Sequence, residues 1–256
     1  MGDMTFIDTH CHISDEAFAG EEDAYIRRAR EAGVEIMLQP DVDSREREAM
    51  FSLTDRHPGV LYPMLGLYPG SVDKDWKKEI DRMLEYSGKK VVAIGEIGLD
   101  YYYGKEFAAE QKEALHWQLD YAKERDLPVN VHLRDAMGDF LDILRSHKGL
   151  RGNMHAYSGS YESFLELQRL GDWSVGVGGV VTFKKASLAE VVKKVPLERI
   201  VLETDAPYLT PVPFRGRRNE SSHIPLIAAK VAELKGLPVE EVAAVTTSNA
   251  RNLFGI

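Results

Sequence analysis

Residues 91–96 read V-V-A-I-G-E, an apolar and largely β-branched run that ends in a carboxylate. A continuous apolar run of this length is typical of a strand in a parallel sheet, because both faces of such a sheet are buried. Seven similar runs recur along the chain: T-F-I-D (5–8), V-E-I-M-L (34–38), V-L-Y-P-M-L-G (60–66), P-V-N-V-H (128–132), G-N-M-H-A (152–156), W-S-V-G-V (173–177) and I-V-L-E-T-D (200–205). We therefore expect eight strands.

Stretches of helical length separate these runs. The stretch 108–126 repeats apolar residues at the spacing of one helix face. Ser187 and Glu190 have the spacing of a capping box, which predicts a helix start, and Pro238 suits the first turn of a last helix. Parallel strands need helical crossovers, so this alternation favours an α/β fold, the (β/α)8 TIM barrel, as a single domain over residues 1–256. A doubly wound open sheet is the alternative.

The composition excludes several classes of protein. Hydrophobic residues make up 44% of the chain and charged residues 29%, which excludes disordered, collagen-like and coiled-coil chains. The net charge of −9 gives no overall positive field to attract nucleic acid or an anionic membrane. A single cysteine, Cys11, excludes an intramolecular disulfide and a Cys-rich zinc module. We find no membrane-spanning run and no signal-peptide pattern, so we expect a cytoplasmic protein, and we infer no obligate protein partner.

Titratable side chains stand at or just past the carboxyl ends of five predicted strands: His10, His12, Glu96, His132, His155 and Asp205. In a barrel these strand ends converge on one mouth, where barrel enzymes hold their active sites. Imidazole nitrogens and carboxylate oxygens are suitable ligands for Zn²⁺, Mn²⁺ or a similar cation. Six such groups exceed one tetrahedral site, so we expect two divalent cations that share one carboxylate.

Each of these residues also has a plainer interpretation when taken singly. Glu96 could form a structural ion pair, and either of the two later histidines could be a hydrogen-bonded core residue. On an extended backbone His10 and His12 face the same side, which makes Cys11 a small core residue facing away. Asp8 shares the side of the two histidines and could be a hydrogen-bond partner of one of them.

Basic side chains near the same mouth could bind an anionic substrate. Arg134 lies two residues after the histidine of the fifth predicted strand, and therefore on the same side. Arg215 and Arg217 lie in the loop F-R-G-R-R-N (214–219) beyond the eighth strand, and guanidinium groups match phosphate geometry. We interpret the tyrosine run 101–103 as loop packing, with stacking on a nucleobase as the alternative.

With these residues, the chain resembles the TatD family of metal-dependent deoxyribonucleases, within the amidohydrolase-like barrels, over essentially its whole length. Three long motifs carry the resemblance: F-I-D-T-H-C-H (6–12), P-V-N-V-H-L-R-D-A (128–136) and L-E-R-I-V-L-E-T-D-A-P-Y-L-T-P (197–211). One departure is visible. The family usually has Gly-x-His-Pro after the third strand, whereas this chain reads G-L-Y-P (66–69), with Tyr68 in place of the imidazole. That change bears on phosphate handling or substrate preference and not on metal binding.

The resemblance implies a metal pair bridged by Glu96, in which the remaining ligands divide into His10, His12 and Asp205 on one side and His132 and His155 on the other. We expect hydrolysis of phosphodiester bonds in DNA, as a 3′-end exonuclease, with RNA not excluded. Asp205 and Glu96 are the predicted catalytic residues, with Asp205 as general base, and the predicted substrate-binding residues are Arg134, Tyr68, Arg215 and Arg217. The alternatives are a hydrolase of the same superfamily for a small ester, amide or phosphate, and a metal-binding scaffold without catalysis.

Overall fold

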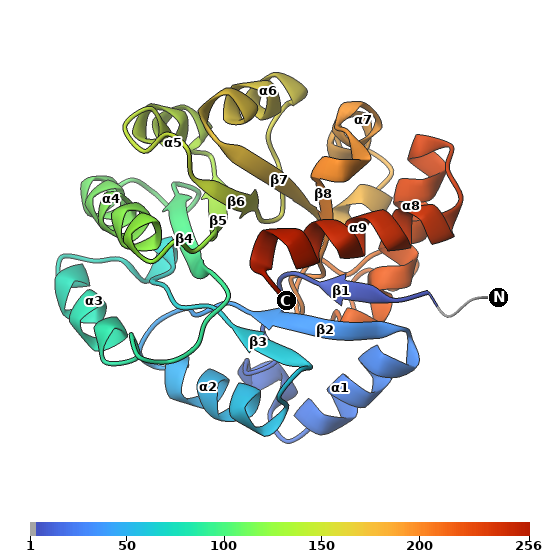
Figure 1. Ribbon diagram of the computed structural model, residues 1–256, viewed down its shortest axis with the longest axis horizontal. Helices are drawn as coiled ribbons and strands as arrows, with labels where there is room; N and C mark the ends of the chain where they lie inside the picture. The colour runs from blue at the N-terminus through green and yellow to red at the C-terminus, as the bar shows by residue number, and fades with distance from the viewer. Residues whose placement is uncertain (1–3) are drawn as a thin grey trace.

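The computed structural model describes residues 4–256, so the first three residues of the N-terminal stretch that we searched for a signal peptide lie outside the described part. Within residues 4–256, eight parallel strands and nine α-helices alternate (Figure 1). The strands are β1 (Phe6–Asp8), β2 (Val34–Gln39), β3 (Leu61–Pro63), β4 (Ile94–Asp100), β5 (Val129–Arg134), β6 (Arg151–Met154), β7 (Asp172–Val177) and β8 (Ile200–Leu202). The helices are α1 (Glu22–Glu31), α2 (Arg47–Arg56), α3 (Trp76–Leu84), α4 (Ala108–Glu124), α5 (Met137–Leu144), α6 (Tyr161–Leu170), α7 (Leu188–Lys194), α8 (Ile224–Lys235) and α9 (Val239–Phe254).

The strands close into a barrel in chain order. They form one group of three, β1–β2–β3, and one group of five, β4 to β8. A parallel bridge between Leu65 and Ile94 joins the end of the first group to the start of the second. A second bridge, between Cys11 and Ala206, joins the segments that follow β1 and β8. The closed ring confirms the predicted TIM barrel and excludes the open-sheet alternative.

Alternation along the strands divides the core into an outer and an inner part. Phe6 of β1 belongs to a large cluster between strands and helices, whereas its neighbour Ile7 belongs to a smaller cluster inside the barrel. Ala250 and Phe254 of α9 join this inner cluster. The Thr247 hydroxyl also donates to a backbone oxygen just before β1. Helix α9 therefore covers the amino-terminal end of the barrel, leaving the carboxyl-terminal end for the candidate site (Figure 1).

Strand β4 departs from the prediction. Glu96 was expected to end the strand, but the strand continues to Asp100, so that expectation is wrong. The pairing of β4 with β5 shifts register between Ile94 and Ile97. At this irregularity the Glu96 amide donates to the backbone oxygen of Asp41, after β2, at 3.0 Å, instead of to β5. A bulge of this kind re-aims a side chain, which explains how a carboxylate can occupy the middle of a buried strand.

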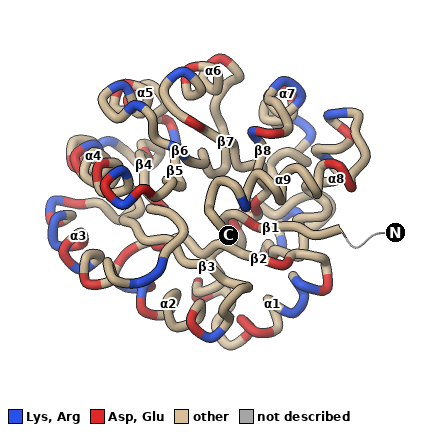
Figure 2. The backbone as a smooth tube through the Cα atoms, in the orientation of Figure 1, with Lys and Arg blue, Asp and Glu red and all other residues tan. Residues whose placement is uncertain are grey.

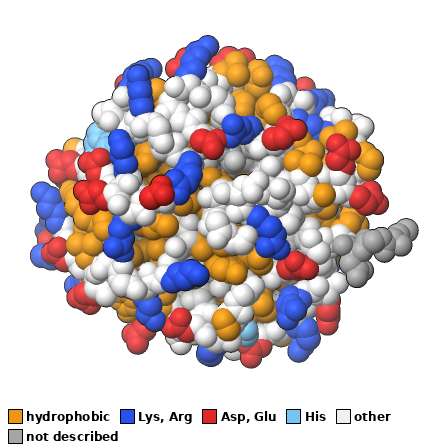
Figure 3. Space-filling view, in the orientation of Figure 1, with side chains coloured by type: hydrophobic (Ala, Val, Ile, Leu, Met, Phe, Trp, Pro, Cys, Tyr) orange, Lys and Arg blue, Asp and Glu red, His pale blue; other side chains and the backbone are white. Residues whose placement is uncertain are grey.

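The predicted helices are present, but their ends differ slightly from the prediction: α4 ends at Glu124, and Pro238 precedes the last helix instead of lying in its first turn. The predicted helix 108–126 is α4, and the last helix begins at Val239, directly after Pro238. Ser187 does precede α7, but its side chain makes no capping hydrogen bond, so the predicted capping box is not formed. Charged residues lie mainly on the outer helices (Figure 2), and on the face in Figure 3 side chains of both signs are interspersed. Among the described residues, none of the helices is both long and apolar enough to cross a bilayer.

Candidate metal centre

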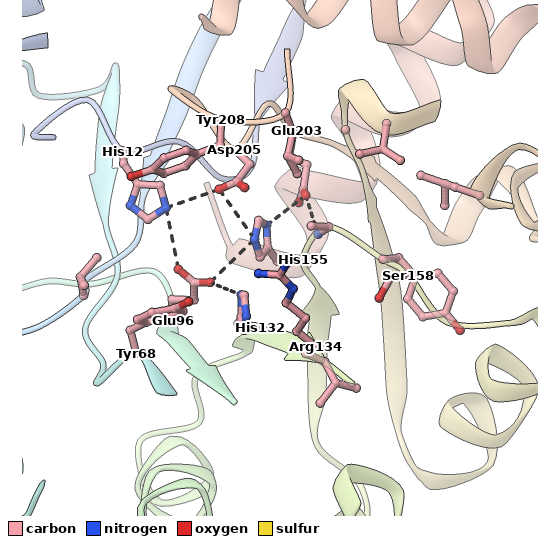
Figure 4. Close-up of a pocket in the computed structure, with 18 of the residues that line it drawn as sticks. His12, Tyr68, Glu96, His132, Arg134, His155, Ser158, Glu203, Asp205 and Tyr208 are labelled. Carbon is pink, nitrogen blue, oxygen red and sulfur yellow. Dashed lines mark hydrogen bonds and ion pairs between the residues drawn. The ribbon is translucent and has the colours of Figure 1, made fainter. Parts of the chain in front are cut away.

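A cavity of about 700 Å³ opens at the carboxyl-terminal end of the barrel. Residues predicted for the site line it from six different strands or strand ends (Figure 4): His12, Tyr68, Glu96, His132, Arg134, His155 and Asp205. His10 is fully buried directly behind His12. The structure thus brings all six predicted ligand residues together.

The two histidines after β1, His10 and His12, point their Nε2 atoms toward each other. Their Nε2 atoms lie 3.1 Å apart, as the predicted shared side requires, and Cys11 between them is a buried core residue, as predicted. The Nδ1 atom of His10 lies 3.0 Å from Oδ1 of Asn130 on β5. Because an amide oxygen only accepts, Nδ1 of His10 carries the proton and its Nε2 is left with a free lone pair.

Glu96 lies between two groups of imidazoles. Its Oε2 is 3.5 Å from Nε2 of His10 and 3.8 Å from Nε2 of His12, while its Oε1 is 2.9 Å from Nδ1 of His132 and 3.7 Å from Nε2 of His155. Burial alone would raise the pKa of Glu96, but the surrounding imidazoles hold it well below the usual value, so the carboxylate is ionised. Each oxygen faces a different group, an arrangement suited to a bridging ligand.

Carboxylates on the far side of the rings orient the other two histidines. Nε2 of His132 lies 3.0 Å from Oδ2 of Asp100, and Nδ1 of His155 lies 3.0 Å from Oε1 of Glu203. Burial would lower both imidazole pKa values, but these neighbours and Glu96 raise the pKa of His132 to about 9 and that of His155 to about 10. Each ring is thereby fixed with its other nitrogen toward Glu96.

The residues that orient the histidines, Asn130, Asp100 and Glu203, were not predicted, although the positions of two of them in the sequence could have indicated their role. Asn130 stands two residues before His132, and Glu203 two residues before Asp205, so alternation along the expected strands 128–132 and 200–205 would put each on the side of a predicted ligand. A polar group at such a position needs a buried partner. Asp100 had no comparable signal, because its contact with His132 depends on β4 extending beyond the predicted end.

Asp205 completes the cluster from the loop after β8. Its Oδ1 lies 3.5 Å from Nε2 of His12, 3.7 Å from Nε2 of His10 and 3.8 Å from Nε2 of His155. Burial would raise the pKa of Asp205, but these imidazoles lower it, so this carboxylate is ionised too. Its backbone has a positive φ of 56°, an uncommon conformation for an aspartate that is fixed by its amide donating to the His10 oxygen at 2.9 Å.

Asp8 has a different role from the predicted one. Its carboxylate does not contact an imidazole; it accepts hydrogen bonds from the His10 and Thr204 amides and from the Thr204 and Ser221 hydroxyls. Burial raises the pKa of Asp8 to about 7 against these hydrogen bonds. Asp8 therefore ties the backbone of β1 to the segment after β8, and positions His10 through its main chain.

The residue types and their spacing fit a divalent cation. Three sets of ligand atoms lie within 4.8 Å of one another: His10, His12 and Glu96; His10, His155 and Asp205; and Glu96, His132 and His155. Two Nε2 atoms only 3.1 Å apart, one of them with a free lone pair, are the arrangement that a cation between them would stabilise. Nitrogen and oxygen donors of this kind suit Zn²⁺, Mn²⁺ and related cations.

The predicted substrate-binding residues divide into two groups. Arg134 and Tyr68 line the cavity, and the Tyr68 hydroxyl donates to Oδ2 of Asp100 at 3.4 Å. Arg215 and Arg217 are exposed and do not line it; the Arg215 guanidinium instead lies 4.3 Å above the ring of Phe183. The loop turns its guanidinium groups onto neighbouring aromatic rings, and substrate binding by Arg215 and Arg217 stays a prediction.

Known proteins resemble this chain over nearly its full length. The family described as TatD related DNase matches residues 7–255. An uncharacterized metal-dependent hydrolase of Bacillus subtilis, YabD, is 37% identical over 97% of this chain and 98% of that protein. A protein of Erwinia amylovora named 3′-5′ ssDNA/RNA exonuclease TatD is 34% identical over 97% of this chain and 99% of that protein.

The fold is also close to a solved structure. The crystal structure of YjjV, a TatD homologue of Escherichia coli, superposes with a TM-score of 0.90 at 32% identity and covers 99% of both chains. The family match spans the strands that supply the clustered histidines and carboxylates. The chain therefore belongs to the TatD-related DNase family of metal-dependent hydrolases.

Proposed function

We propose that this protein hydrolyses phosphodiester bonds of DNA at a 3′ end with the help of two divalent cations, and that RNA is a second substrate. The observation that carries the proposal is the position of Glu96, whose two oxygens face two different sets of imidazoles. The name of the Erwinia relative supports the direction and the polymer. The match over residues 7–255 supports one catalytic unit spanning the chain.

Glu96 would be shared by both cations. The other ligands would be His10, His12 and Asp205 for one cation and His132 and His155 for the second. When bound, the cations would supply Lewis-acid chemistry, lowering the pKa of water and neutralising charge on phosphoryl oxygens. Zn²⁺, Mn²⁺ and Mg²⁺ are the candidates, with imidazole-rich ligands favouring the first two.

The chain's own residues would supply the remaining chemistry. Asp205, ionised and open to the cavity, would accept a proton from the attacking water. Arg134, at the edge of the cavity next to His132, would bind the phosphoryl oxygens and neutralise their charge (Figure 4). Burial and nearby carboxylates raise the pKa of Tyr68, so its phenol stays protonated, and its hydroxyl would turn from Asp100 to donate its one hydrogen bond to the substrate.

The test is metal removal followed by metal return. Protein stripped with EDTA is reloaded separately with Mg²⁺, Mn²⁺ and Zn²⁺, and assayed on single-stranded DNA and RNA labelled at the 5′ end. Cleavage should return only with metal, and the 5′-labelled products should shorten progressively from the unlabelled end. Circular dichroism of the stripped protein checks that its fold is intact.

A parallel panel of ester and amide substrates addresses the main alternative, which the replacement of the usual imidazole by Tyr68 favours. Metal-dependent hydrolysis of an ester or amide by protein that leaves DNA and RNA intact would overturn the nuclease proposal.

A further inference from the structure

Large hydrophobic side chains that remain exposed gather at the mouth of the cavity. Among the described residues, six such side chains are exposed, and four of them form two adjacent pairs, one in the loop after β4 and one in the loop after β8: Tyr102 (56% exposed), Tyr103 (88%), Tyr208 (54%) and Leu209 (39%). Three of these four line the cavity itself. A concentration of exposed apolar surface around a polar site indicates a ligand with apolar faces of its own.

The two loops face each other across the barrel. Tyr103 lies in the loop after β4, and Tyr208 in the loop after β8. In a closed ring of eight strands in chain order, the fourth and eighth strands are diametrically opposite. The Tyr208 amide donates to the backbone oxygen of Asp205 at 2.8 Å, and the Tyr208 ring lies edge-on to His12. One tyrosine therefore stands on each side of the clustered ligands.

The rings of Tyr102 and Tyr103, in the loop after β4, contact the guanidinium of Arg134 in the cavity wall. The Arg134 guanidinium lies 3.3 Å above the ring centre of Tyr102 and 5.7 Å from that of Tyr103. The two tyrosine rings meet edge-on at 4.9 Å. The stacked guanidinium keeps its in-plane N–H groups available, because stacking uses only its faces. The loop after β4 thus places an exposed aromatic face beside the guanidinium of Arg134 at the end of β5.

The negative net charge of the protein makes the aromatic faces more important for its affinity for nucleic acid. The chain carries a net charge of −9, so long-range attraction cannot supply its binding energy for a polyanion. Stacking on unpaired bases does not depend on net charge, and it needs base faces that a duplex covers. Resting on the proposed function, we infer that Tyr103 and Tyr208 are stacking surfaces for unpaired nucleobases on the two sides of the cleaved phosphate.

The experiment combines protein variants with changes in the substrate. Metal-loaded wild-type protein, Tyr103→Ala, Tyr103→Phe and Tyr208→Ala are assayed on single-stranded DNA and on the same oligonucleotide with abasic sites at its last two 3′ positions. Leu165→Ala is the matched control, because Leu165 is an exposed hydrophobic residue on α6 outside the cavity. The parameters KM and kcat are determined separately for each pair.

We expect each Tyr→Ala change to raise KM for DNA on the order of 5- to 100-fold, with a much smaller effect on kcat. The abasic oligonucleotide should show a similar loss with wild-type protein, and Tyr103→Ala should then add little to it. The Phe variant, which keeps the aromatic face, should restore most of the affinity. Leu165→Ala should behave as wild type.

Two results would overturn the inference, and they are distinguishable. If wild-type protein cleaves DNA but both Ala variants keep the wild-type KM, the stacking assignment is wrong while the proposed function stands. If wild-type protein hydrolyses a small diester without a base, methyl 4-nitrophenyl phosphate, but leaves DNA and RNA intact, the proposed function fails and the stacking surfaces fail with it.

Discussion

Nδ1 of His155 lies 3.0 Å from Oε1 of Glu203, a carboxylate with no exposed surface. The same oxygen accepts a hydrogen bond from the Ala156 amide at 2.6 Å. A carboxylate at this position keeps the proton on Nδ1, so that Nε2 of His155 faces Glu96 and Asp205. Glu203 is therefore a positioning residue, which acts on the candidate metal centre through the imidazole.

This relationship predicts the effect of Glu203→Gln. The substitution preserves shape but removes the charge that fixes the imidazole, and it should weaken metal binding by roughly 10- to 100-fold. Competition with a chromogenic chelator measures the affinity directly and independently of turnover. Glu190→Gln, on the exposed surface of α7, is the control. Unchanged affinity in Glu203→Gln would remove the positioning role.

Asp205→Asn tests the proton acceptor. The amide is nearly isosteric with the carboxylate but does not accept a proton at neutral pH, so turnover at saturating metal should fall by at least about 100-fold. The unfolding midpoint in urea should change little, because the backbone contacts of residue 205 remain. Asp142→Asn, at an exposed carboxylate on α5, serves for comparison. A near-wild-type rate for Asp205→Asn would refute the assignment.

A fully buried ion pair, Arg47–Asp41, lies next to the backbone of Glu96. Nε of Arg47 lies 2.7 Å from Oδ2 of Asp41, and the Asp41 peptide exchanges hydrogen bonds with Gly95 and Glu96. Arg47→Met leaves the carboxylate buried without its partner, and should lower the free energy of unfolding by about 3–5 kcal/mol in urea titrations.

The double variant Asp41→Leu/Arg47→Met distinguishes two causes of instability in the single variant: the unpaired buried carboxylate and the loss of packing around Arg47. With both charges gone, much of the stability should return, since two apolar groups can replace a buried pair at small cost. A double variant as unstable as the single one would show that the pair is needed for its hydrogen bonds rather than its charge balance.

Asp43 predicts a dependence of stability on pH that is separate from the metal centre. Burial alone would raise the pKa of Asp43, but Arg45 and Ser71 bring it to about 2, below the ordinary 3.8. The charged form is favoured in the folded state, so its contribution is complete above pH 3.8 and is lost as the pH falls toward 2.

The measurement compares wild type with Asp43→Asn in urea titrations containing EDTA. The difference in unfolding free energy should be about 1–2 kcal/mol near pH 6, reduced by the solvent exposure of Arg45, and most of it should be lost by about pH 2. A difference that stays constant over this range would mean that hydrogen bonding, and not charge, makes the contribution.

The sequence predicted the parts of the site that strand periodicity determines. His10 and His12 could be placed on one side because alternate residues of a strand share a face, and the barrel brings the strand ends together. Arg215 and Arg217 could not be placed, since no repeat fixes the direction of a loop. The position of Glu96 inside β4 depends on a register shift that only the pairing with β5 reveals.

The division of the barrel into three and five strands has a mechanical consequence. The predicted ligands lie at both seams between these groups: Glu96 next to the Leu65–Ile94 bridge, and His12 and Asp205 on either side of the Cys11–Ala206 bridge. A bound cation would therefore connect the two groups of strands, β1–β3 and β4–β8, and stabilise the closed ring. Because an ion that binds only the closed ring stabilises it by mass action, metal loading should slow hydrogen exchange and proteolysis at the seams more than elsewhere.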